Sequence, residues 1–429
     1  MHTHNLNENQ KESGRSDRYT GDLRSGIHED LRDHTSLSAL SAPVGYLSPR
    51  LALLFAVAAG LAVANIYFAQ PLLDAMALEF GMEPAWVGSV ITVTQLCYAA
   101  GLLLLVPLGD LLNRHRLIPL QMLISVVALL IVGLARTESM LFAGMAVIGL
   151  LAVVTQTLVA FAADLAKPAE RGRIVGMVTS GVVIGILLAR TFAGTLTDLA
   201  GWRSVYLASA CLTLILAGVL SLLLPKPAAT AKRISYLQLL RSVLKLFLEE
   251  PILRIRAVLA LLIFAAFSIL WTSLVLPLSS PPLSLSHSGI GAFGLAGAAG
   301  ALGASRAGRL ADRGLGQRTT GFALALLLVS WFPISLVHQS LFVLVLGIIL
   351  LDFAVQAVHV TNQTLILATR PEARSRLTAG YMIFYSLGSA VGSIASTHIY
   401  ASNGWYGVCG LGAMVSLLAL LFWALTRKR

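Results

Sequence analysis

The sequence predicts an all-α membrane protein with twelve transmembrane helices in two pseudo-symmetric six-helix bundles. The 429 residues are 57% hydrophobic and only 12% charged, whereas soluble domains have roughly 45–50% apolar and about 25% charged residues. Long apolar runs recur along the chain, and its two halves resemble each other at a fixed offset. This composition excludes an ordinary soluble enzyme and a disordered or collagen-like chain.

Twelve apolar runs are long enough to cross a bilayer, which takes roughly 20 residues per helix. The predicted spans are 51–73, 86–109, 117–136, 139–163, 174–197, 204–224, 256–278, 289–308, 319–337, 342–367, 378–400 and 405–425. These runs do not alternate apolar and polar residues as the strands of a membrane barrel would. Because the number of spans is even, both termini are expected on the same side.

The predicted spans divide the chain into four parts. Residues 1–48 are polar and cannot bury a core, so we expect a disordered tail there. An N-terminal six-helix bundle over 49–224 and a C-terminal bundle over 257–429 are joined by a basic linker, 225–256. Within this linker, the stretch from Lys232 to Arg256 has the pattern of an amphipathic surface helix.

The basic residues predict the orientation. Of the 31 Lys and Arg residues, 28 lie in the tail, in the linker, in the C-terminal segment and in the loops on one side of the predicted spans. Only Arg136 and Arg203 lie on the other side, and Arg190 lies inside a span. Since basic loops stay in the cytoplasm, both termini are expected to be cytoplasmic.

The halves repeat at an offset of about 203 residues. Lys167–Arg173 matches Arg370–Arg376, so that Arg171 corresponds to Arg374, and the pair Gly201-Trp202 matches Gly404-Trp405. Several matches in one register indicate a duplicated unit. Two parallel halves around a midplane site are typical of secondary transporters.

The loops after the second and eighth spans resemble a motif of the major facilitator superfamily, G-x-x-x-D-R-x-G-R-R. In the first loop Asp110, Arg114 and Arg116 match, and in the second Gly308, Asp312 and Arg313 match. The resemblance covers nearly everything after residue 50 and implies the major facilitator fold. In such a short turn, a carboxylate can meet a helix N-terminus and a nearby Arg, which would stabilise one gating state. We assign the same gating role to Arg171 and Arg374; simple anchoring of the loops is the alternative.

The fifth span resembles a motif of proton-coupled exporters in that family, G-x8-G-x3-G-P-x2-G-G. Gly176, Gly185 and Gly194 match, while Arg190 replaces the proline. Small residues at this spacing allow close helix approach, and the eighth span offers a matching glycine-rich surface. The resemblance therefore implies export, with generic close packing as the alternative.

The tenth span carries the clearest intramembrane polar set. Asp352, Gln356, His359 and Gln363 share one helix face, and Asn362 lies beside it. Asp352 is placed about 15 Å from the outer end of its helix, near the bilayer centre. We assign proton coupling to Asp352 and His359, because buried ionisable groups in membranes usually serve function. An inter-helix hydrogen-bond network is the alternative.

Further polar side chains interrupt other spans and are predicted to line a substrate cavity together with Gln356, Asn362 and Gln363. These residues are Asn65, Tyr67, Gln70, Gln95, Tyr98, Gln156 and Arg190. Amides and phenols can orient a polar substrate, and helix–helix hydrogen bonding is the alternative. The stripe Phe264, Phe267 and Trp271 predicts packing against lipid or a neighbouring helix, with substrate stacking as the alternative.

The sequence contains no phosphate-binding loop, dinucleotide fingerprint, or zinc or haem spacing. We therefore expect neither an enzyme nor a cofactor or metal, and no nucleic acid as a partner. The predicted function is proton-coupled efflux of a small organic molecule by alternating access, by a monomer in a bacterial inner membrane. Uptake or facilitated diffusion of a polar solute is the alternative, and a transport-inactive sensor or scaffold is a remote one.

Overall fold

The computed structural model describes residues 48–429, except for 168–169, 226–234, 305–306, 308–309, 371–372 and 428–429. The side chains at positions 110, 303, 311, 312 and 375 also lie outside the description. The predicted disordered tail falls almost entirely outside the described residues. Over the described residues the chain is helical and contains no strand.

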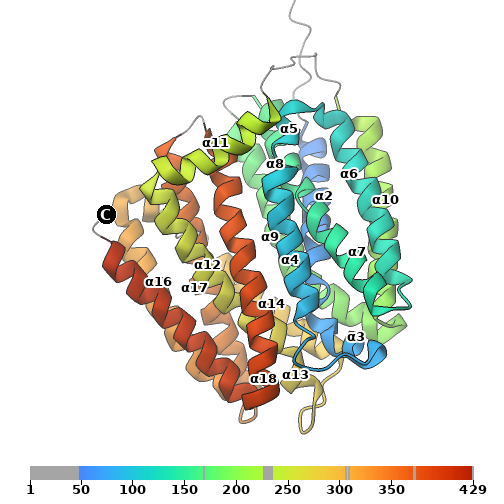
Figure 1. The fold of residues 1–429 in the computed structure, drawn as a ribbon, viewed down its shortest axis with the longest axis vertical. Helices are drawn as coiled ribbons and strands as arrows, with labels where there is room; N and C mark the ends of the chain where they lie inside the picture. Colours follow the sequence, from blue (N-terminus) through green and yellow to red (C-terminus); the bar gives the residue numbers. More distant parts are fainter. Residues whose placement is uncertain are drawn as a thin grey trace, which may run out of the picture. The chain divides into compact units, whose positions relative to one another are not determined.

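The first half contains six spans, several of them made of two helices in sequence (Figure 1). Its helices are α2 (Pro49–Tyr67), η1 (Gln70–Leu72), α3 (Leu73–Phe80), α4 (Ser89–Leu104), α5 (Leu108–Leu111), α6 (Arg114–Gly133), α7 (Glu138–Leu151), α8 (Val154–Leu165), α9 (Arg171–Ala200) and α10 (Trp202–Leu223). Local capping sets several of the boundaries. The Ser48 hydroxyl accepts a hydrogen bond from the Leu51 amide and Pro49 occupies the first turn, as expected at a helix N-terminus.

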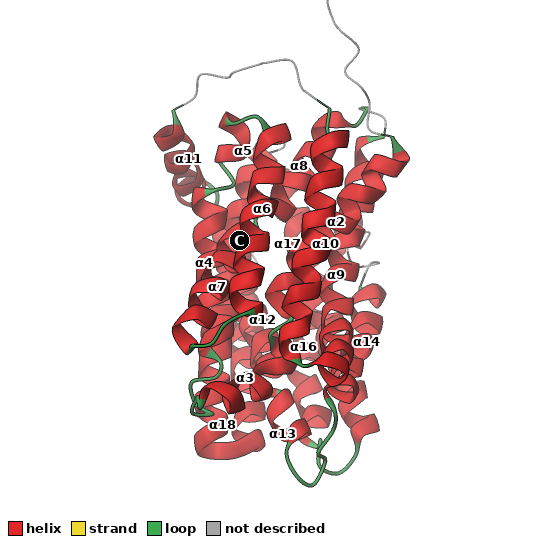
Figure 2. Cartoon of the chain, turned by 90° about the vertical axis from the view of Figure 1, so that its right-hand side faces the viewer, coloured by secondary structure: helices red, strands yellow, loops and turns green. Residues whose placement is uncertain are grey.

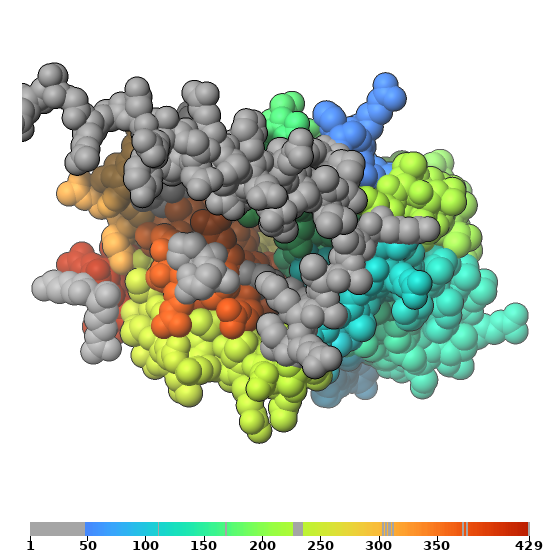
Figure 3. Space-filling view, turned by 90° about the horizontal axis from the view of Figure 1, so that it is seen from above, coloured from blue at the N-terminus to red at the C-terminus, as the bar shows by residue number. Residues whose placement is uncertain are grey.

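The second half repeats this arrangement after a connecting helix, α11 (Tyr236–Glu249). Its helices are α12 (Pro251–Ser273), α13 (Val275–Ser279), α14 (His287–Gly303), η2 (Ala311–Leu315), α16 (Gly316–Ser335), α17 (Leu341–Thr369) and α18 (Arg374–Thr426). Seen from the α5 end, the blue-to-green half and the yellow-to-red half lie side by side (Figure 3).

Nine helical segments within the described residues are long and apolar enough to cross a membrane. The last of them, residues 376–426, breaks at Gly404 and so provides two spans. The shorter helices α4 and α14 correspond to the second and eighth predicted spans. Each of the twelve predicted spans therefore has a helical counterpart, and the predicted all-helical fold is confirmed.

Equivalent breaks occur in both halves. Gly201 and Gly404, which are 203 residues apart, have φ angles of +79° and +61°. This left-handed region disfavours residues with a side chain, so glycine ends one helix sharply and lets the next begin. Trp202 and Trp405 follow and are both buried. The shared geometry at the sequence offset supports the duplication.

The α11 helix confirms the amphipathic pattern of the linker but is shorter than predicted. Its apolar face buries Leu239, Val243 and Leu246. Hydrogen bonds from Lys245 and from Arg370 lower the pKa of Glu249 at its C-terminal end. The following helix, α12, begins at Pro251, earlier than the predicted start of the seventh span at residue 256.

The most extensive contacts between the halves are those of α9 with α14 and of α4 with α18. They lie toward the end of the molecule that holds α3 and α13, here called the α3 end, whereas α5 and α11 lie at the opposite, α5 end (Figure 2). Gly194 of α9 lies so close to α14 that a Cβ atom would be 2.1 Å from the His287 carbonyl oxygen. The matching glycine-rich surfaces predicted for the fifth and eighth spans are therefore in contact.

Candidate functional site

Two proline-associated breaks position the central side chains. Pro71 lies four residues after Tyr67, where α2 ends, and Pro277 lies four residues after Ser273, where α12 ends. A proline ring clashes with the carbonyl group four residues earlier and removes one helical hydrogen bond. The first transmembrane helix of each half is thus interrupted, α2 beside Tyr67 and Gln70 and α12 beside Trp271. Interrupted helices at midplane depth are a recurring feature of transporter binding sites.

Arg190 of α9 is buried between the halves, with 2% of its surface exposed. Its Nε donates to Gln70 Oε1 at 2.9 Å, and its guanidinium carbon lies 3.9 Å from the Trp271 ring centroid. The rings of Tyr67 and Phe267 lie at 5.4 and 5.5 Å. The Arg190 Nη2 atom is buried without a hydrogen-bond partner. This side chain does not reach toward the membrane surface; it points into the interface of the two halves.

Asp352 of α17 lies at the Nε1 edge of Trp271. The indole Nε1 donates to Asp352 Oδ1 at 3.2 Å, and the carboxylate is 3% exposed. Its Oδ2 occupies space beside Gly297 of α14, where a Cβ atom would be only 2.1 Å away. Among the residues that the structure describes, no carboxylate oxygen lies within 4.0 Å of the Arg190 guanidinium. Trp271 therefore contacts two buried groups of opposite charge type from different halves.

An aromatic cluster extends from this pair toward the α5 end. The hydroxyl groups of Tyr67 and Tyr385 form a buried hydrogen bond between α2 and α18. Phe264 packs against Tyr385 with ring centroids 3.9 Å apart, and against His359 at 5.2 Å. The aromatic stripe of the seventh span is buried and faces helices of both halves, not lipid.

His359 lies about two turns from Asp352 along the same helix, toward the α5 end, and has its own partners. Its Nδ1 lies 3.0 Å from the Tyr381 hydroxyl and its Nε2 lies 3.3 Å from Gln363 Nε2. Gln356, between Asp352 and His359, is partly buried. Asp352, His359 and Gln363, three of the four residues predicted to share a face, thus each contact a polar or aromatic side chain of this region.

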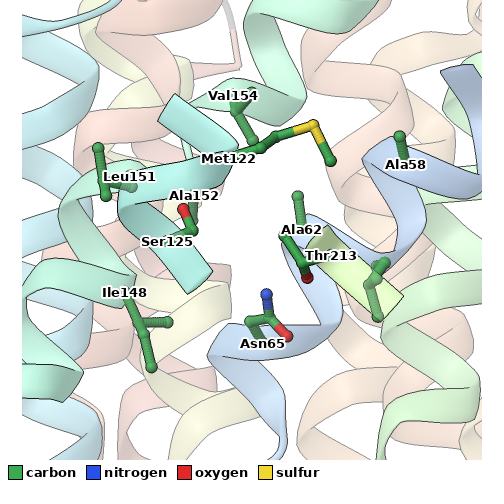
Figure 4. Close-up of a pocket in the computed structure, with 11 residues that line it drawn as sticks. Ala58, Ala62, Asn65, Met122, Ser125, Ile148, Leu151, Ala152, Val154 and Thr213 are labelled. Atoms are coloured by element: carbon green, nitrogen blue, oxygen red, sulfur yellow. The ribbon is translucent and has the colours of Figure 1, made fainter. Parts of the chain in front are cut away.

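The other predicted cavity residues divide between two places. Gln95 and Tyr98 of α4 are buried, Gln95 Oε1 has no partner, and Gln156 of α8 is the side-chain partner of Tyr98. Asn65, in contrast, accepts a hydrogen bond from Ser209 of α10 at 2.6 Å, inside the first half. There it lines a cavity of about 10 Å³ with Ser125 and Thr213 (Figure 4), which has room for about one water molecule.

Asn362 does not face Asp352. Its Oδ1 accepts from Arg256 Nη1 at 3.2 Å, and the same nitrogen donates to Thr320 at 3.3 Å. Arg256, at the predicted boundary between the linker and the seventh span, is 4% exposed and lies within α12. Pro251, which occupies the first turn of α12, was the signal for this earlier helix start.

The predicted gating loops are described only in part. Arg114 Nη1 contacts Asp164 of α8 at 2.5 Å, and its Nε donates to the Gly109 carbonyl at 2.7 Å. Arg171 Nε donates to the Ala163 carbonyl at 2.8 Å. Arg116, Arg313 and Arg374 are exposed, and the side chains of Asp110 and Asp312 and all of Gly308 lie outside the described residues.

A second charged cluster closes the α3 end and was missed in the sequence. His287, at the start of α14, lies 3.3 Å from both Asp74 and Asp198. The backbone amides of His287 and Ser288 donate to the Asp198 carboxylate at 3.1 and 2.7 Å. The carboxylate of α9 thus caps a helix of the other half. The available signal in the sequence was the position of Asp74, Asp198 and His287, each of which lies close to the end of a predicted span.

Helices in two repeated halves, charged groups buried where the halves meet, and breaks beside these groups define a secondary transporter fold. The sequence profile of the Major Facilitator Superfamily matches residues 55–329 and 283–429, and the chain belongs to this family. It is a multi-pass membrane transporter of the major facilitator type.

Two relatives agree with this assignment. The chain is 48% identical over 384 residues to the uncharacterized transporter YgaY of Escherichia coli O157:H7, covering 90% of this chain and 97% of that one. It is 32% identical over 379 residues to the probable transporter SCO4007 of Streptomyces coelicolor, covering 88% and 86%.

Solved structures show the same fold. A bacterial homologue of the human lysosomal transporter Spinster, in an inward-facing and unoccupied conformation, superimposes with a TM-score of 0.70 at 16% identity, covering 90% of this chain and 97% of that one. The nucleoside transporter NupG gives a TM-score of 0.68 at 16% identity, covering 87% and 99%.

Proposed function

We propose that this transporter exports a small organic molecule in exchange for protons, with Asp352 as the residue that carries the proton. The observation that carries the proposal is the arrangement of Arg190, Trp271 and Asp352 between the halves. Arg190 belongs to the first half and Asp352 to the second, so the energy between their charges changes when the halves move. Protonation of Asp352 removes its attraction to Arg190 and can therefore be coupled to alternating access.

Burial supports this role for Asp352. An ionised carboxylate inside a membrane protein is costly and is retained where it serves a pathway or a proton relay. Trp271 donates only one hydrogen bond to it, which is weaker compensation than a direct ion pair. His359 is held by Tyr381 and Gln363 and stands further along the same helix, where it would pass protons toward the α5 end.

Export is supported by the close contact between α9 and α14. Gly194 and Gly291 let the backbones approach, and Thr191 Oγ1 donates to the Gly291 carbonyl at 3.0 Å. Gly194 and Thr191 belong to the small-residue stretch of α9 that resembles the exporter motif, and Gly291 belongs to the matching surface of α14. Uptake by proton symport is the second candidate, favoured by Arg190 in place of the proline of that motif.

In the proposed topology the halves 49–224 and 257–429 rock around the central site in a bacterial inner membrane, and both termini are cytoplasmic. The basic residues support a cytoplasmic location for the α5 end. In this topology the His287 cluster joins the two halves at the periplasmic end. A monomer contains both halves and therefore the complete site.

Everted membrane vesicles test the proposal. The vesicles are acidified by respiration, and the internal pH is followed with quinacrine while amino acids, sugars and organic cations are added one at a time. We expect at least one compound to release protons in wild-type vesicles and none to do so with Asp352→Asn. Proton release by Asp352→Asn vesicles, or no release by any compound in the wild type, would contradict the proposal.

A further inference from the structure

The central site holds a cation and an anion that are not paired with each other. Arg190 has one hydrogen bond to a neutral amide, one long contact at 3.5 Å to the Ile186 carbonyl, and a buried Nη2 atom without a partner. Asp352 receives one indole hydrogen bond. Burying two separated charges is expensive unless other groups compensate both. Such an arrangement fits a ligand that supplies the missing partners.

We propose that the substrate is a zwitterion of the amino-acid class, whose carboxylate binds Arg190 and whose ammonium group binds Asp352. The inference rests on the proposed export function and names its substrate. The ligand would make one charge-assisted hydrogen bond of about 2.7–2.9 Å to Arg190 and another to Asp352. Because a short carbon link joins its two charged groups, the ligand can bridge two side chains that are too far apart to form an ion pair. In the structure the Trp271 indole N–H donates to the Asp352 carboxylate. The ammonium group of the bound ligand would donate to the same carboxylate.

Charge balance distinguishes this class from singly charged ligands. Arg190 and an ionised Asp352 together are neutral, and a zwitterion leaves them so. An organic anion would give the buried site one net negative charge, and an organic cation one net positive charge, each with a desolvation cost. Protonation of Asp352 removes the ammonium partner, so one proton displaces one zwitterion, as exchange requires.

The groups around Asp352 are consistent with this exchange. Among the described residues, the charged or titratable side chains that interact with Asp352 or with Arg190 from other elements include Tyr67 of α2 and Tyr385 of α18, and the two groups also interact with each other. The two tyrosines hydrogen-bond each other. Asp352 is thus the acid that changes charge beside the ligand.

The surroundings also indicate the body of the ligand. Phe264, Phe267 and Trp271 form one aromatic wall beside the charges, with neighbouring ring centroids 6.0 and 6.3 Å apart. Aromatic walls favour apolar and aromatic side chains over strongly polar ones. The expected substrates are therefore amino acids with apolar or aromatic side chains.

Three matched sets of probes test the proposal with the full-length protein in detergent. Each set contains an amino acid, leucine, phenylalanine or tryptophan, together with its amide, which keeps only the ammonium charge, and its deamino acid, which keeps only the carboxylate. Binding is measured calorimetrically at pH 7.5. We expect at least one amino acid to bind at least 10-fold more tightly than both of its singly charged analogues.

Two variants then assign each charge to its partner. Asp352→Asn should abolish the 10-fold advantage over the deamino acid, and Arg190→Gln the advantage over the amide. Glu83→Gln and Arg254→Gln, which change exposed residues, should retain both preferences and so control for the loss of a charge as such. Thermal unfolding of each variant confirms that it is folded.

Equal binding of the singly charged analogues, no binding by any of the three amino acids, or unchanged preferences in both variants would overturn the zwitterion proposal. Proton release from vesicles by a compound of another class, lost in Asp352→Asn, would leave the export proposal standing while the substrate class fails. The two proposals are thereby tested separately.

Discussion

Arg190 and Asp352 contact the same indole, Arg190 over its face and Asp352 at its edge. The Arg190 guanidinium lies over the Trp271 ring at 3.9 Å, and the Trp271 N–H donates to the Asp352 carboxylate at 3.2 Å. A cation over an aromatic face and a hydrogen bond to its edge are both favourable, so Trp271 stabilises both charges at once. It does so across the interface of the two halves, where a change in either charge affects how the halves meet.

Trp271→Phe tests the hydrogen bond in this arrangement. Phenylalanine keeps an aromatic face for Arg190 but has no N–H for Asp352, so the free energy of unfolding should fall by about 1.5–3 kcal/mol. In an Asp352→Asn background the same change should cost less, because the acceptor is no longer charged. Unfolding in mixed micelles measures all four proteins of this double-mutant cycle. Equal costs in both backgrounds would mean that the indole N–H does not stabilise the carboxylate.

Gly297→Ala should disturb the site through Asp352. The new Cβ atom would lie 2.1 Å from Asp352 Oδ2 and 2.9 Å from a Trp271 ring carbon, so both must shift, at a cost of about 1–3 kcal/mol. Gly218→Ala is the matched control, because no atom lies within 4 Å of its new Cβ, and alanine favours the helix by up to about 1 kcal/mol. We expect proton release in vesicles to be lost only in Gly297→Ala. Similar behaviour of the two variants would contradict the close packing around Asp352.

The His287 cluster should hold the α3 end closed. Asp198→Asn weakens the cap on α14 and the contact with His287, so the two halves should separate more often at this end. Spin labels at Leu199→Cys and Phe342→Cys, both strongly exposed positions in different halves, report the separation after the native cysteines are replaced by serine. We expect a second, longer distance in the variant. An unchanged distance distribution would show that closure does not depend on Asp198.

The membrane topology is tested with reporter fusions. Of the basic residues, 28 lie on one side of the predicted spans. A reporter enzyme that is active only in the cytoplasm should therefore be active when fused after Arg429, and one that is active only in the periplasm should be active when fused at His338. Each reporter enzyme is fused at both positions, so the inactive fusion of each enzyme is the control for the active one. A periplasmic C-terminus would contradict the predicted topology.

The fold could be predicted from the sequence because apolar runs and basic loops report directly on membrane spans. The breaks at Pro71 and Pro277 could not be inferred with the same certainty, since proline inside a membrane helix can also be accommodated without a break. Helical spacing placed Asp352 and His359 on one face, but it does not show how a helix is rotated against its neighbours. For this reason the contact of Arg190 with Trp271 and the location of Asn65 inside the first half required the structure.

The most direct measurement of the central claim is transport in proteoliposomes by Asp352→Asn compared with the wild type. Asparagine has nearly the same size and hydrogen-bonding capacity but cannot bind and release a proton. We expect the variant to exchange labelled substrate across the membrane at equal concentrations, because exchange needs binding and movement of the halves only. It should fail to accumulate substrate when a pH gradient is imposed. Uphill accumulation by Asp352→Asn in response to that gradient would show that another residue carries the proton.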